Sequence, residues 1–168
     1  MMDPARVAVV MISFTAVAGL AACNQSSSPM ASSQAAAVEL QVHKTAACGC
    51  CEGWVEHIED NGFSAQVFNH DELSSLKAEY QIPRRYQSCH TAVSQDGYVF
   101  EGHIPAKVVR RFLDEKPPDA LGLTVPGMPV GSPGMESGES FMPYQVLLLM
   151  RDGTTVVYAE MGSMDEQH

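Results

Sequence analysis

The order of apolar and polar residues along the chain predicts alternating strands and helices. Apolar and polar residues alternate over residues 38–43, which indicates a first strand. From Cys51 onward the apolar residues recur at the i, i+3, i+4, i+7 spacing of an amphipathic helix, and Gly62 follows its expected end. A second strand is predicted over residues 63–69.

The middle of the chain continues this alternation of elements. A helix is predicted over residues 72–80, with Asp71 as its N-cap. Residues 88–95 and 98–103 predict a hairpin around an Asp-Gly turn, and Pro105 begins a further helix with one apolar face. The order strand, helix, strand, helix, strand, strand, helix is that of a thioredoxin-like α/β fold, in which helices flank a central mixed sheet.

The last third of the sequence departs from this pattern. Residues 119–143 are rich in Met, Gly and Pro, so a loop is expected there and no regular element. Residues 144–150 and 154–160 predict a final β-hairpin around a second Asp-Gly turn. We therefore expect one domain over residues 38–162, followed by a short tail at 163–168.

The first residues are typical of an exported protein. The uncharged run over residues 7–20 is short for a membrane span and fits the apolar region of a signal peptide. It ends in Leu-Ala-Ala-Cys23, which resembles the bacterial lipoprotein box, so residues 1–22 are expected to be removed and Cys23 to carry lipid. An ordinary secretory cleavage site is the alternative. Asn24 at the next position points to the outer membrane of a Gram-negative bacterium, facing the periplasm, and residues 23–37 read as a flexible tether.

Charge and cysteine content narrow the function classes. The chain carries 10 basic and 20 acidic residues, and its net charge of −10 argues against nucleic acid as a partner. If Cys23 is lipidated, the cysteines that remain are Cys48, Cys50, Cys51 and Cys89. Because two of them are adjacent, two unstrained disulfides are hard to build from this set, which favours a metal site.

Cys48, Cys50 and Cys51 lie at the start of the first predicted helix, whose N-terminus stabilises thiolates. In the predicted topology, the segments that carry Cys89-His90 and His103 return to the same edge of the sheet. Thiolates and thioethers select Cu(I), with zinc and iron–sulfur clusters as rivals. The sequence thus predicts that four thiols and two imidazoles converge on one site.

Other potential ligands are less well placed by the pattern. His43, at the end of the first predicted strand, can approach the same edge, whereas His57 and His70 are interpreted as surface residues without a function. Met128 and Met135 lie in the Gly- and Pro-rich loop, where helical periodicity does not explain them as core residues, and they offer soft thioether ligands.

Four blocks of the sequence together resemble the CopG-type bacterial copper-resistance proteins. These blocks are Cys48-Gly49-Cys50-Cys51-x-x-Trp54, Ser88-Cys89-His90-Thr91, Glu101-Gly102-His103-Ile104-Pro105 and residues 126–135. The resemblance implies a periplasmic thioredoxin-like domain that holds Cu(I), more than one ion bridged by thiolates. The ligands it implies are Cys48, Cys50, Cys51 and Cys89, with His90, His103, Met128 and Met135 as outer or neighbouring ligands. Copper ions, and periplasmic proteins that donate or accept copper, are the partners it implies.

Three functions stay open on the sequence. The predicted function is that of a copper-binding protein for copper resistance. The protein is expected to bind copper and not chiefly to act as an enzyme, and Cu(I)/Cu(II) redox activity stays open. The second is a thiol–disulfide oxidoreductase that uses Cys48 and Cys51, although Cys50 would interfere with exchange and Cys89 stands where such enzymes usually carry a proline. The third is a structural zinc site, which the adjacent Cys50 and Cys51 fit poorly.

Overall fold

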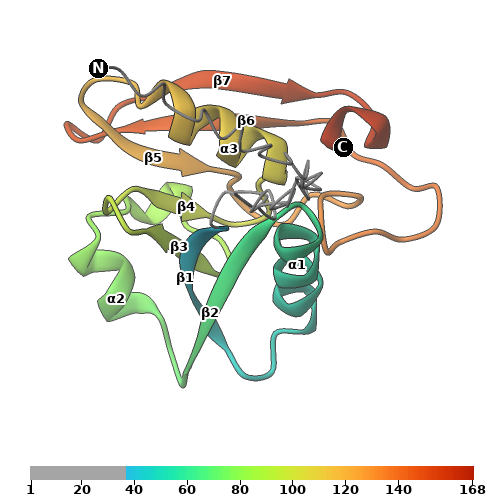
Figure 1. Cartoon of the computed structure of the whole chain (residues 1–168), viewed down its shortest axis with the longest axis horizontal. Helices are drawn as coiled ribbons and strands as arrows, with labels where there is room; N and C mark the ends of the chain where they lie inside the picture. Colours follow the sequence, from blue (N-terminus) through green and yellow to red (C-terminus); the bar gives the residue numbers. More distant parts are fainter. Residues whose placement is uncertain (1–36) are drawn as a thin grey trace, which may run out of the picture. The chain divides into compact units, whose positions relative to one another are not determined.

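The computed structural model describes residues 37–168, in which seven strands form one mixed sheet flanked by helices (Figure 1). The strand order is β2-β1-β3-β4-β5-β6-β7. The strands are β1 (Val38–Thr45), β2 (Phe63–His70), β3 (Thr91–Ser94), β4 (Val99–Glu101), β5 (Ala120–Thr124), β6 (Tyr144–Met150) and β7 (Thr155–Met161). The helices are α1 (Gly49–Asp60), α2 (Ser74–Glu79) and α3 (Ala106–Glu115), with short 3₁₀ turns η1 (Arg84–Tyr86) and η2 (Met164–Gln167).

The strand pairing brings three chain segments to one edge of the sheet. β1 runs parallel to β2 and antiparallel to β3, with His43 opposite Thr91. β4 returns antiparallel to β3, with Thr91 opposite Glu101. The end of β1, the start of β3 and the end of β4 therefore lie side by side, as the sequence predicts. The final hairpin of β6 and β7 is also confirmed.

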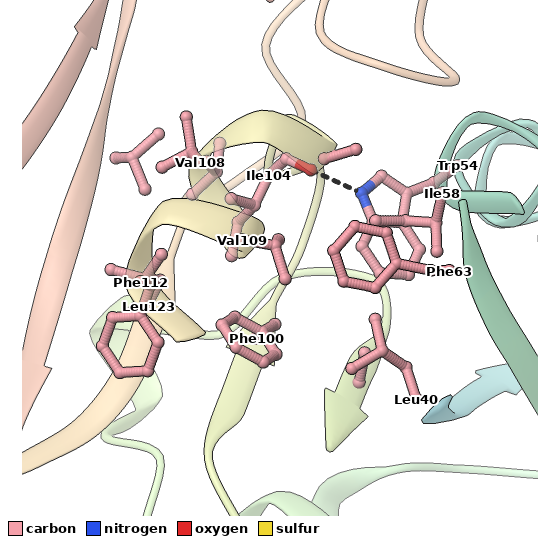
Figure 2. Packing of buried hydrophobic residues seen from close by; sticks show 14 of the residues in the cluster. Leu40, Trp54, Ile58, Phe63, Phe100, Ile104, Val108, Val109, Phe112 and Leu123 are labelled. Carbon is pink, nitrogen blue, oxygen red and sulfur yellow. Dashed lines mark hydrogen bonds between the residues drawn. The ribbon is translucent and has the colours of Figure 1, made fainter. Parts of the chain in front are cut away.

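The main hydrophobic core lies between the sheet and the helices α1 and α3 (Figure 2). Trp54 from α1 and Phe112 from α3 are wholly buried in it, beside Leu40 and Phe100 from the sheet. The Trp54 indole N–H donates a hydrogen bond of 2.9 Å to the Ile104 carbonyl, drawn in Figure 2. This bond fixes α1 against the segment that follows β4, because a buried indole N–H needs a partner.

The prediction that residues 119–143 hold no regular element was wrong, because β5 begins at Ala120. All five residues of β5 are buried, so the strand lacks the polar alternation by which a half-buried strand is recognised. Gly122 lies in the middle of β5. In the structure it permits close pairing, since a Cβ atom at Gly122 would lie 1.7 Å from the Val99 carbonyl oxygen of β4.

The predicted start of the second helix was also wrong. α2 begins at Ser74 with Leu73 in the N-cap position, and Asp71 does not cap it. The Glu72 carboxylate instead accepts the Ser74 N–H at 2.8 Å. A carboxylate thus still satisfies a free N–H group of the first turn, but from a different residue.

The predictions for residues 1–22, for lipidated Cys23 and for nearly all of the tether lie outside the described residues. Within residues 37–168, no helix combines the length and the apolar character needed to cross a membrane.

Candidate metal centre

Four cysteine sulfurs meet where α1 begins. Cys48 occupies the N-cap position of α1, Cys50 lies in the first turn, and Cys51 is wholly buried against the core. Cys89 comes from the segment before β3. The Sγ atoms of all four lie within 4.8 Å of one another. The structure therefore brings together every cysteine that the sequence analysis assigned to the site.

Two of these four cysteines are joined. Cys48 and Cys51 form a disulfide, and Cys50 and Cys89 are free thiols. The Cys50 Sγ lies 3.4 Å from the Cys48 Sγ. In this state the site has two thiols that can lose a proton, and two further sulfurs that become thiolates only after reduction.

A second group of donors shares Cys89 with the first. The Cys89 Sγ lies 3.0 Å from His103 Nε2 and 3.3 Å from His90 Nδ1. His103 Nδ1 lies 2.8 Å from the Pro133 carbonyl oxygen, which can only accept, so Nδ1 carries the proton. The Nε2 lone pair of His103 consequently faces the thiol. A backbone carbonyl that fixes the tautomer in this way is characteristic of histidine metal ligands.

His90 is wholly buried between aromatic rings. Its ring centroid lies 4.4 Å from that of Trp54 and 5.0 Å from that of His103. Burial, followed by the nearby His103 and Lys77, holds the pKa of His90 well below its usual range, so the imidazole is neutral. Its Nε2 atom has no hydrogen-bond partner among the described residues. A buried nitrogen without a partner is unusual, because nearly all buried polar atoms in proteins are hydrogen-bonded.

Three of the potential ligands, Cys89, His90 and His103, have pKa values that are shifted away from their charged forms. Burial, and then the neighbouring Cys50, raise the pKa of the Cys89 thiol to about 12. Burial also lowers the pKa of His103. Without a metal ion, the site therefore holds a protonated Cys89 thiol and neutral imidazoles at neutral pH.

Metal affinity is accordingly expected to rise with pH. Because the pKa of Cys89 is raised, its proton must leave when a metal ion binds, and each displaced proton makes the affinity increase about tenfold per pH unit. Competition with a Cu(I) chelator between pH 6 and 8 measures this slope in reduced protein. A pH-independent affinity would contradict thiolate ligation by Cys89.

Residues 126–135, which carry Met128 and Met135, are held against this site by the contact of the Pro133 carbonyl with His103 and at two further points. The Ser88 hydroxyl donates to the Gly127 carbonyl at 2.5 Å. A Cβ atom at Gly134 would lie 2.4 Å from the Trp54 backbone nitrogen, so the segment lies directly on α1 there. Met128 is 53% exposed and Met135 is half-buried. Their role as ligands stays a prediction.

Two residues that support the site were missed by the sequence analysis. Glu101 is wholly buried, and its carboxylate accepts the Ser88 N–H at 2.5 Å, the Thr91 hydroxyl at 2.6 Å and the Lys77 ammonium group. It thereby fixes both ends of the segment that carries Cys89 and His90. The sequence signal for this buried pair was a lysine on the apolar face of a helix. Lys77 follows Leu73 by four residues and thus lies on the apolar face of α2.

Sheet and site together define an α/β protein with a thiol-rich site suited to a soft metal ion. Two solved structures described as copper resistance protein CopG, Form 1 and Form 2, are each 42% identical to this chain, with a TM-score of 0.70. Each alignment covers 74% of this chain and 98% of the other. This chain belongs to the CopG copper-resistance family.

One further comparison gave a match and another gave none. A family model described as a protein of unknown function, DUF411, matches residues 86–135, which contain Cys89, His90, His103 and Met135. A search of the curated proteins gave no match.

Proposed function

We propose that this protein binds Cu(I) for copper resistance in the periplasm, through Cys48, Cys50, Cys51 and Cys89. The observation that carries the proposal is the convergence of four sulfurs within 4.8 Å of one another. Thiolates select Cu(I) over harder ions. The expected anchor is a lipid on Cys23 in the outer membrane, and the intact mass of the mature protein tests this.

More than one copper ion is proposed, because the donors outnumber those one ion can use. Four sulfurs and the imidazoles of His90 and His103 fall into two groups that share Cys89. One tetrahedral ion takes four ligands. A Cys89 thiolate that bridges two ions satisfies both groups, and the thioethers of Met128 and Met135 are proposed as outer ligands.

The proposed scaffold is thioredoxin-like, built from β1, α1, β2, α2, β3, β4 and α3. This scaffold accounts for the Cys48–Cys51 disulfide at the start of α1. The same disulfide favours a second candidate function, a thiol–disulfide oxidoreductase. The free Cys50 thiol, 3.4 Å from the Cys48 sulfur, weighs against that function because it competes in exchange.

Metal analysis of protein purified anaerobically from the periplasm after copper exposure separates these candidates. The proposal expects more than one copper per chain. One zinc per chain, unaffected by copper supply, would favour a structural site. A metal-free protein that reduces insulin disulfides would favour the oxidoreductase.

Copper loading is expected to depend on the redox state of the protein. Reduction of the Cys48–Cys51 disulfide by a dithiol consumes two electrons and two protons, and it yields two thiols that become ligands when they lose their protons. Reduced protein should therefore bind more Cu(I) per chain than protein in which this disulfide is intact. Cu(I) titration of both forms under argon, followed by native mass spectrometry, checks this, and equal stoichiometries would exclude Cys48 and Cys51 as ligands.

A further inference from the structure

We propose that the buried ammonium group of Lys44 is the counter-charge of the metal centre, where it stabilises the negative charge of the thiolates. The proposal rests on the proposed function, because it names a further residue that sets the affinity of that site for Cu(I). Lys44 lies near the end of β1, and its side chain is only 3% exposed. A lysine is almost never buried to this degree unless its charge is paired.

The ammonium group lies beside the start of α1. Leu40 and Val42 belong to the core between the sheet and α1, and side chains two residues apart along a strand point the same way, so Lys44 faces this helix too. The Thr45 carbonyl accepts one hydrogen bond from Lys44 Nζ at 3.3 Å and another from the Cys48 N–H at 3.1 Å. The cation and the N-cap cysteine of α1 therefore share one acceptor.

The strand register also places Lys44 beside His90. β1 is antiparallel to β3, and their pairing ends with His43 opposite Thr91. One step further along, Lys44 comes opposite His90, and opposite residues of an antiparallel pair lie on one face of the sheet. Burial is the main cause that lowers the pKa of His90, and the charge of Lys44 is one of the smaller causes. The cation thus adjoins both chain segments that carry the thiols.

The charge of Lys44 is only partly offset in the metal-free protein. Among the described residues it pairs with one carboxylate, that of Glu52 at 3.2 Å, which is 63% exposed. Water and salt screen an exposed carboxylate, so it offsets a buried cation incompletely. Each thiolate adds one negative charge to the site and each Cu(I) ion adds one positive charge. The site is therefore anionic while thiolates outnumber ions, and Lys44 supplies the opposite charge.

Lys44→Met tests the counter-charge, because it keeps a long apolar side chain and removes the ammonium group. Competition with a Cu(I) chelator measures the affinity of the reduced full chain. The affinity for the first ion should fall by at least about tenfold, since a charge a few ångströms away acts strongly in a partly buried site. Lys116→Met is the matched control. It makes the same change of residue and net charge in the exposed pair with Asp96, and it should bind Cu(I) as the wild type does.

Glu52→Gln separates the charge of Lys44 from any structural role of the ion pair. It breaks the same pair, but it leaves Lys44 charged and removes a negative charge next to Cys51. Cu(I) affinity should therefore rise, by roughly twofold for an exposed group. Equal losses of affinity in Glu52→Gln and Lys44→Met would show that the pair only supports the fold, and would overturn the proposal. Wild-type affinity in Lys44→Met would overturn it as well.

A metal-free measurement keeps this proposal separate from copper binding. At about pH 8, where thiols begin to ionise, the Cys48–Cys51 disulfide is equilibrated with a dithiol buffer. The protein disulfide gains two electrons and two protons and becomes two thiols, and the buffer dithiol becomes a disulfide. Lys44→Met should shift this equilibrium toward the protein disulfide by about threefold or more, because the thiolate form loses its counter-charge.

The two measurements fail independently. If the wild-type protein takes up no Cu(I), the proposed function is wrong, but the shift in the dithiol equilibrium still identifies Lys44 as the counter-charge of the thiolates. If Lys44→Met leaves that equilibrium unchanged, the counter-charge is wrong whether or not the protein binds copper.

Discussion

Replacing Cys50 with serine is expected to lower the Cu(I) content of reduced protein from more than one ion to one ion or fewer per chain. The Cys50 sulfur lies 3.4 Å from that of Cys48 and within 4.8 Å of that of Cys89. Its removal leaves three thiolates, and a serine hydroxyl is a hard, protonated group that does not replace a thiolate for Cu(I). Native mass spectrometry after anaerobic Cu(I) loading counts the ions directly.

Cys50 is the cysteine whose loss tests ligation with the least structural disturbance. Cys48 and Cys51 form the disulfide, and Cys51 is also part of the buried face of α1. Cys50 is a free, partly exposed thiol, so its replacement should change the free energy of unfolding by about 1 kcal/mol or less. A loss of copper can then be attributed to a lost ligand.

Gly49→Ser provides the matched control. It introduces the same hydroxyl at the neighbouring position, where a Cβ atom would meet nothing within 4 Å, and it keeps every thiol. This variant should load copper as the wild type does. Should Cys50→Ser retain more than one copper, the thiolate-bridged cluster would be wrong. Equal losses in both variants would point to damage of the first turn of α1.

The convergence of the thiols could be predicted from the sequence because it depends on topology alone. Alternating residues identified the first strand and the hairpin that carries His103, and the direction of each strand placed its end at the same edge. β5 could not be found in this way. A strand buried on both faces has no alternation, and Gly122 and the nearby prolines resemble loop residues until the neighbouring strand is seen.

Two features of the structure depend on information that a local pattern does not contain. The C-x-x-C spacing is compatible with a disulfide and with two metal-bound thiolates, and the redox state selects between them. His43, which the sequence analysis placed within reach of the thiol edge, instead lies with its Nδ1 atom 3.0 Å from His70 Nε2. This contact depends on the register of β1 against β2, and a shift of one residue would place the two side chains on opposite faces of the sheet.

The buried ion pair beneath the site leads to the largest expected effect on stability. Glu101→Gln should lower the free energy of unfolding by about 3–5 kcal/mol, because it leaves the buried Lys77 ammonium without its counter-charge. Urea unfolding followed by the fluorescence of Trp54, the single tryptophan of the chain, measures this change. All variants must be compared in the same disulfide state.

Lys77→Met removes the other partner of the buried pair. The Lys77 ammonium group also donates to the Ser88 carbonyl and to the Thr91 hydroxyl, both at 3.1 Å, so it holds the same segment as Glu101. This variant should therefore destabilise the fold by a similar amount, since it leaves the Glu101 carboxylate buried without its counter-charge. Both single variants should also lower the Cu(I) affinity, because both loosen the segment that carries Cys89. Wild-type Cu(I) affinity in both variants would show that the ion pair does not position the metal site.

The double variant and a surface pair complete the test. Because the two groups touch, Lys77→Met combined with Glu101→Gln should cost less than the sum of the single changes. Lys116→Met breaks the exposed pair with Asp96 and should change stability little, since solvent-exposed ion pairs contribute little. If Glu101→Gln and Lys77→Met both unfold at the same urea concentration as the wild type, Glu101 does not hold the segment that carries Cys89 and His90 in place.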